Sequence, residues 1–171
     1  MLRHDPAEAA DERTQLTQFL DYHRATLLMK VDGLDQAQMG ATTAASDLTL
    51  AGLLKHLALV EDDWFRVVLH GEEPSSPWDG IDWDADPNWE FRTAVDDAPA
   101  DLITLYEETC ERSRRAVAAI GSLDDLAARP SRRNGQRFNL RWILLHMIEE
   151  TARHNGHADL LREAIDGATG E

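Results

Sequence analysis

Four long segments of the sequence place apolar residues at intervals of three and four, and no segment alternates convincingly as a β-strand would. This periodicity gives an α-helix one apolar stripe, which must be buried against other helices. The segments span residues 6–31, 49–69, 99–120 and 140–165. A helix bundle lets each of these stripes face a common core. The sequence therefore predicts an all-α protein built as a four-helix bundle.

Residues typical of helix ends support these boundaries. Glycine is common just beyond a helix C-terminus, and a glycine follows each apolar pattern: Gly33, Gly71, Gly121 and Gly167. Side chains that can cap an N-terminus precede the last three segments. They are Ser46, Asp47 or Thr49 for the second, Asp97 ahead of Pro99 for the third, and Asn139 for the fourth. A further short helical turn is predicted at residues 123–128.

The connection between the second and third predicted helices is long, about 28 residues from 71 to 98. A loop of this length is uncommon in a compact domain and is often functional. In a four-helix bundle it permits a crossover, so that the helices it joins run parallel. It carries three tryptophans, Trp78, Trp83 and Trp89. Their rings either cap one end of the bundle or wall a pocket, and the two interpretations are compatible.

Bulk composition narrows the class of protein. A chain of 171 residues fits one domain, residues 1–171. Its single cysteine, Cys110, excludes an intrachain disulfide, and its place on the apolar stripe of the third helix predicts a structural role. No signal-peptide pattern and no apolar span of about 20 residues is present. We therefore expect a cytoplasmic protein without membrane attachment.

The charge balance argues against nucleic acid as a partner. The formal net charge is −15, from 32 acidic and 17 basic residues, and such a chain is repelled by phosphate backbones and anionic lipid. One basic, turn-rich segment, residues 130–138, contains Arg132, Arg133 and Arg137. It either binds an anionic group of a ligand or balances charge locally.

The fourth predicted helix carries the densest group of metal-binding residue types. His146, Glu150 and His154 are four residues apart and share one helix stripe, which His157 continues. Apolar residues flank this stripe, so it borders the core, where unpaired polar groups cost several kcal/mol. Ligands one turn apart on a helix can share a metal ion. The spacing therefore predicts that Glu150 and His154 bind a metal together.

A catalytic metal site needs a third protein ligand and an open position. His56 is the best candidate, because it lies in the middle of the second helix among apolar neighbours. His23 is weaker, and His4 and His70 lie near chain or helix ends. Spacing alone leaves other interpretations open. These are a core histidine at position 56, an exposed pair on the fourth helix, and His146 as a ligand.

Taken together, these residues resemble the DinB-like metalloprotein superfamily. One resembling stretch is SDLTLAGLLKHLALVEDDWF, residues 46–65, and the other is FNLRWILLHMIEETARHNGHADLLREAIDG, residues 138–167. The second contains the pattern ExxxHxGHxD. The superfamily more often has HxxxH, and Glu150 takes the place of its first histidine, as in mycothiol-linked members. The nearest subgroup is allied with mycothiol S-transferases and maleylpyruvate isomerase.

The resemblance implies a divalent metal, zinc or another such as nickel, held by His56, Glu150 and His154. It makes His146, His157, Arg153 and Trp64 supporting or pocket residues. It implies a homodimer and a metal-dependent transferase that joins a low-molecular-weight thiol, mycothiol foremost, to an electrophilic small molecule in detoxification. Alternatives are a hydrolase or isomerase that uses metal-bound water, a non-catalytic stress-related protein whose metal site His146 or His157 closes, and a bundle without metal.

Overall fold

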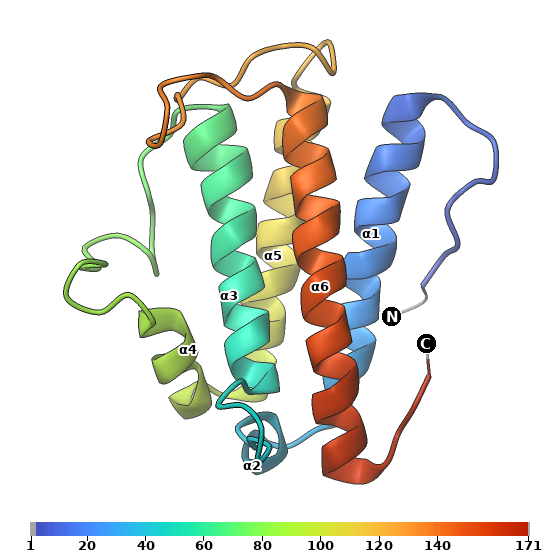
Figure 1. Ribbon diagram of the computed structural model, residues 1–171, viewed down its shortest axis with the longest axis vertical. Helices are drawn as coiled ribbons and strands as arrows, with labels where there is room; N and C mark the ends of the chain where they lie inside the picture. Colours follow the sequence, from blue (N-terminus) through green and yellow to red (C-terminus); the bar gives the residue numbers. More distant parts are fainter. Residues whose placement is uncertain (1–2, 171) are drawn as a thin grey trace.

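The computed structural model describes residues 3–170, and Figure 1 shows these as a bundle of helices. Its long helices are α1 (Glu12–Val31), α3 (Leu50–Asp62), α5 (Pro99–Ala118) and α6 (Leu140–Asp166). Helix α3 continues without a break into a π-helical segment, η1 (Asp63–Leu69). The described residues form no strand, only two isolated β-bridges. The predicted all-α bundle is therefore confirmed.

The long helices pack so that α6 lies against α1 and α3, while α3 also packs on α5 (Figure 1). Short elements occupy the connections. They are α2 (Gln36–Met39), α4 (Trp89–Thr93) and the 3₁₀ turn η2 (Ala94–Asp96). The periodicity did not predict these three, because each is too short to show a helical repeat. Helix α4 belongs to the long crossover and packs against α3.

Several predicted helix ends agree with the structure. Thr49 Oγ1 accepts a hydrogen bond from the Gly52 amide at 2.9 Å, which caps α3. Asn139 Oδ1 accepts from the Trp142 amide at 2.9 Å, which caps α6. Gly167 ends α6 in the left-handed region, with φ 76°. The long helix that carries the candidate ligands is therefore delimited by the residues that the sequence singled out.

Other boundary predictions were wrong. Helix α1 begins at Glu12 rather than at residue 6, because the carboxylate of Asp11 caps it by accepting from the Thr14 amide. Asp97 does not cap α5, because its carboxylate pairs with Lys55 at 2.6 Å instead. Residues 123–128 are not helical, since their backbone bonds to the residues before α6, including a bridge between Leu126 and Asn139.

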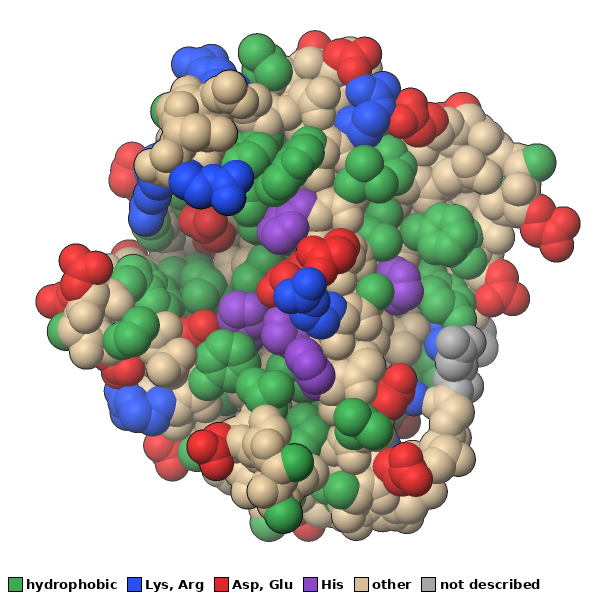
Figure 2. All heavy atoms as spheres, viewed as in Figure 1, with side chains coloured by type: hydrophobic (Ala, Val, Ile, Leu, Met, Phe, Trp, Pro, Cys, Tyr) green, Lys and Arg blue, Asp and Glu red, His purple; other side chains and the backbone are tan. Residues whose placement is uncertain are grey.

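Figure 2 shows Asp and Glu side chains scattered over the visible face rather than gathered in one patch. Among residues 3–170, no helix combines the length and the apolar character that crossing a membrane requires.

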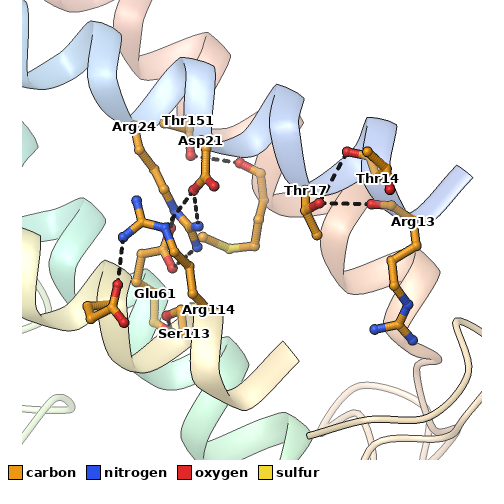
Figure 3. Close-up of polar contacts among 11 residues, drawn as sticks. Arg13, Thr14, Thr17, Asp21, Arg24, Glu61, Ser113, Arg114 and Thr151 are labelled. Carbon is orange, nitrogen blue, oxygen red and sulfur yellow. Dashed lines mark hydrogen bonds and ion pairs between the residues drawn. The ribbon is translucent and has the colours of Figure 1, made fainter. Parts of the chain in front are cut away.

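An ion-pair network that is buried at Arg24 and Glu61 joins α1, α3 and α5 (Figure 3). Arg24 donates to both oxygens of Glu61, at 2.7 and 2.6 Å, and the two residues are 3% and 0% exposed. Asp21 Oδ1 accepts from Arg24 and from Arg114, each at 2.9 Å. The thiol of Cys110 is buried in the same region, and burial and the charge of Glu61 raise its pKa far above the ordinary value. This network fixes the relative positions of three long helices.

Helix α4 is held on α3 by contacts at two residues. Lys55 donates to Thr93 Oγ1 at 2.8 Å, and its ammonium group lies 4.5 Å above the centre of the Trp89 ring. Gly52 allows the helices to approach, because a Cβ at this position would lie only 3.0 Å from Phe91 Cδ1. The crossover is therefore docked one turn of α3 from His56.

Candidate metal centre

The side chains of His56, Glu150 and His154 converge between α3 and α6. Each can contribute one ligand atom, and these atoms lie within 4.8 Å of one another. His56 Nε2 is 3.4 Å from Glu150 Oε1, and His154 Nε2 is 3.1 Å from the same oxygen. In Figure 2 histidine side chains gather at the centre of the face, where they reach the surface.

These distances fit a divalent ion. In a tetrahedral site with bonds of about 2.0–2.1 Å, two ligand atoms lie about 3.3–3.4 Å apart. Two imidazole nitrogens and one carboxylate oxygen suit zinc, and imidazole also suits nickel and other borderline ions. All three side chains are partly buried, which shields them from water without closing the site. The donor set, and the distances from the Glu150 oxygen to the two imidazole nitrogens, therefore suit one divalent ion.

The electrostatics of the cluster favour the forms that bind metal. Burial raises the pKa of Glu150, but the neighbouring His154 and His56 outweigh this effect and lower the pKa overall. Burial lowers the pKa of His154, and His56 lowers it further, against the opposing effect of Glu150. A metal site needs an ionised carboxylate and neutral imidazoles. Both shifts act in that direction.

Glu90 is a functional candidate that the sequence analysis missed. Its Oε1 lies 3.0 Å from His56 Nδ1, and the residue is 4% exposed. When Nε2 of His56 faces a metal, its proton is on Nδ1, and that N–H donates to Glu90. Phe91 stacks on the same imidazole at 4.7 Å between ring centres. The only sequence signal was a glutamate between two aromatic residues in the crossover.

His157 lies beside His154, with 3.3 Å between their Nδ1 atoms. If His154 binds a metal through Nε2, its Nδ1–H donates to Nδ1 of His157, which acts as the acceptor. The structure therefore brings His157 next to one of the three ligand candidates. Glu90 therefore contacts His56, and His157 contacts His154, in each case at the Nδ1 atom and not at the nitrogen that faces Glu150.

The remaining candidates lie elsewhere. His146 belongs to an aromatic cluster, with its ring centre 4.8 Å from that of Trp64 and 5.1 Å from that of Trp142. It is not among the three converging residues. Arg153 pairs with Glu149 at 2.7 Å on the exposed side of α6. His146 and Arg153 are therefore not among the residues whose ligand atoms converge.

A cavity of about 300 Å³ lies between η1 and the crossover, and Val60, one helical turn beyond His56, lines it. Trp78 and Trp83 line it, so these two rings wall a pocket, as one of the two interpretations of the sequence stated. Arg132 of the basic segment and Asp63 of η1 also line it. Desolvation by the surrounding protein raises the pKa of Asp63, and the positive charge of Arg132 opposes this rise.

Comparison with known proteins places the chain in a family. The sequence profile of the mycothiol-S-transferase family, a DinB-like family, matches residues 15–167. No curated protein matches the sequence significantly. A solved structure described as "the conserved protein of locus from Enterococcus faecalis" has 16% identity, a TM-score of 0.72, and coverage of 94% of this chain and 100% of its own, which shows the fold alone. The chain belongs to the mycothiol-S-transferase family, which confirms the DinB-like resemblance.

Proposed function

We propose that this member of the mycothiol-S-transferase family is a divalent-metal-dependent enzyme that joins a small thiol, mycothiol foremost, to an electrophilic small molecule. The observation that carries the proposal is the convergence of three ligand atoms within 4.8 Å, from His56, Glu150 and His154. The family match over residues 15–167 supports the transferase class. Two imidazoles and one carboxylate leave a coordination position for a further ligand.

When bound, a divalent ion at this centre supplies stabilisation of a thiolate at neutral pH. The protein's residues do the rest. His56, Glu150 and His154 hold the ion, and Glu90 and His157 fix the orientation and tautomer of the two imidazoles. The adjoining cavity holds the second reactant close by, so that two small molecules react as one bound pair.

The transfer itself balances without an oxidant or a reductant. The sulfur forms a bond to the electrophilic carbon and the thiol loses its proton. At a substitution centre, the bond to the leaving group breaks and that group departs with the electron pair. At a conjugated acceptor, the electron pair moves onto the acceptor, which then takes up a proton.

Zinc is the proposed ion, with nickel as the main competitor. The first test is elemental analysis of protein purified without an affinity tag, for which we expect one divalent ion per chain. His56→Ala should abolish stoichiometric binding. His70→Ala is the matched control, because the His70 ring bonds to the Ala116 carbonyl at 3.0 Å and belongs to no part of the centre.

The second test is a panel of thiol donors with a bimane or chloro-aromatic acceptor. Mycothiol, bacillithiol and glutathione are each supplied to the metal-loaded protein, and we expect turnover that requires mycothiol. Absence of a thiol-dependent rate with all three donors contradicts the proposal. Turnover of a substrate without any thiol supports a hydrolase or isomerase that uses metal-bound water instead.

A non-catalytic metal-binding protein requires a closed site. His146 or His157 would have to complete it, but His157 contacts the far side of His154 and His146 lies in the aromatic cluster. These positions support the open site that the transferase needs.

A further inference from the structure

The cavity beside the metal centre continues the stripe of α3 that carries His56. Val60 and Trp64 line the cavity and follow His56 by four and eight residues. One helical turn advances about 5.4 Å, so the cavity begins one turn beyond His56. On α6, His146 contacts Trp64 and lies one turn before Glu150. A molecule in the cavity therefore has one end close to the metal centre.

The crossover forms the opposite wall and reaches the same centre. The ring of Trp89 lies 6.3 Å from those of both Trp78 and Trp83, which line the cavity. The next residue is Glu90, which contacts His56. Figure 2 shows the surface hollowed between the crossover and the central histidines, with hydrophobic side chains inside.

The buried wall contains a polar atom that lacks a partner. Trp78 is only 3% exposed, and its indole Nε1 is buried without a hydrogen-bond partner among the described residues. Buried N–H groups in native proteins nearly always have an acceptor. Since Trp78 lines the cavity, a ligand there lies against the side chain that carries this unpartnered N–H, although the nitrogen itself is covered in the ligand-free protein.

Few charged side chains line the cavity, and one of them already forms an ion pair. Asp62 is already engaged, because its carboxylate accepts from Arg66 at 2.9 and 3.1 Å. Arg132 makes no hydrogen bond or ion pair with residues 3–170, and it acts electrostatically on Asp63. One cation and one anion remain, beside walls of tryptophan, valine, leucine and proline. This composition suits a mostly apolar ligand with a polar edge.

We propose that this cavity binds the electrophilic acceptor and selects a planar, conjugated carbonyl compound. Flat rings pack against the indoles, and an adjustment of the Trp78 ring on binding lets its Nε1–H donate to the carbonyl oxygen. The proposal rests on the proposed function, which requires an electrophilic acceptor as the second substrate of the transferase. It assigns the cavity to the acceptor and not to the thiol, because the polar tail of a small thiol would need more hydrogen-bonding partners than these walls offer.

The binding test uses two probes of the same shape that do not react with thiols. Acetylnaphthalene carries a carbonyl group, and ethylnaphthalene, substituted at the same position, lacks it. Calorimetry on the full chain without thiol should show tighter binding of acetylnaphthalene by about fivefold, the ratio expected for one neutral hydrogen bond. Trp78→Phe keeps a ring and removes the N–H, so it should abolish this preference.

A second variant keeps the test decisive if the buried Trp78 cannot be replaced without unfolding. Trp83 is half-buried at the wall, and Trp83→Ala should weaken both probes by about tenfold, because it removes an aromatic contact surface. Trp142→Phe is the control, since Trp142 is 44% exposed and does not line the cavity. Failure of the wild type to bind either probe overturns the inference, as does equal weakening by the control.

Kinetics separate this inference from the proposed function. The acceptor is benzylideneacetone, to whose double bond a thiol adds by forming a carbon–sulfur bond at the β-carbon and delivering a proton to the α-carbon. With mycothiol as donor, Trp83→Ala should raise the KM for benzylideneacetone and leave the KM for mycothiol unchanged. A raised KM for mycothiol alone overturns the inference and leaves the transferase in place. Probe binding as expected, without turnover by any thiol, overturns the transferase and supports the carbonyl site.

Discussion

Glu90→Gln preserves the shape of the side chain that accepts from His56 and removes its charge. The wild-type bond is 3.0 Å long and Glu90 is 4% exposed, so the bond is charge-assisted and little screened by water. Loss of a hydrogen-bonded partner of a metal-binding imidazole lowers metal affinity about 10- to 100-fold. We expect an approximately tenfold higher Kd for zinc in Glu90→Gln, and a rise near 100-fold in Glu90→Leu, which removes the acceptor entirely.

The stability of the metal-free protein should not follow this loss. Glu90 Oε2 is buried without a hydrogen-bond partner among the described residues. An unpartnered buried polar group costs about 1–3 kcal/mol, and more when it is charged. Replacing the carboxylate by a neutral amide lowers that cost, so the Tm of the metal-free Glu90→Gln variant should equal or exceed that of the wild type.

Two measurements check this pair of expectations. Competition with a chromophoric chelator gives the zinc Kd, and thermal unfolding with excess chelator gives the metal-free Tm. Glu73→Gln is the matched control, because it makes the same substitution in the same crossover at a side chain that is 86% exposed. Glu90 has no positioning role if Glu90→Gln binds zinc as tightly as the wild type. The same conclusion follows if its weaker zinc binding comes with a lower metal-free Tm that accounts for it.

Three further predictions concern the scaffold. Gly52→Ala places a Cβ 3.0 Å from the phenylalanine ring of α4. It should lower the free energy of unfolding by about 1–3 kcal/mol, measured by thermal unfolding, and it should weaken zinc binding. Gly156→Ala has open space around it and should do neither. Cys110 should resist an aromatic disulfide reagent at pH 8 until the protein unfolds, because burial raises its pKa and leaves little thiolate; rapid labelling of the native state contradicts this. Glu61→Gln leaves Arg24 buried without a full partner and should lower the free energy of unfolding in urea by about 3–5 kcal/mol, while Glu61→Leu with Arg24→Met should recover most of it; a loss below about 1 kcal/mol shows that the pair contributes little.

How much of the candidate site could be read from the sequence depends on the range of each interaction. Glu150 and His154 share one helix, so their spacing alone places them on one stripe. His56 lies on another helix, and only the family resemblance selected it over His146. Glu90 could not be found in this way, because α4 has five residues and its position is set by contacts with α3 rather than by a repeat of its own.

The same distinction applies to the fold. Apolar periodicity predicted the four long helices, because each buries one stripe over several turns. It could not locate the start of α1, where one hydrogen bond to Asp11 decides between helix and extended chain. Nor could it reveal the π-helical turn at residues 63–69, since a change in winding leaves the pattern of apolar residues helical.

Helix α4 touches two places that have been described separately. Glu90 contacts the candidate metal centre, and Trp89 contacts the tryptophans that wall the cavity. Docking of this one short helix is therefore a shared condition of both. A ligand at the metal centre or in the cavity that favours the docked helix makes binding at the other site tighter. Thermodynamic linkage makes this effect reciprocal. Bound metal would then tighten acceptor binding, and bound acceptor would slow the loss of metal to a chelator.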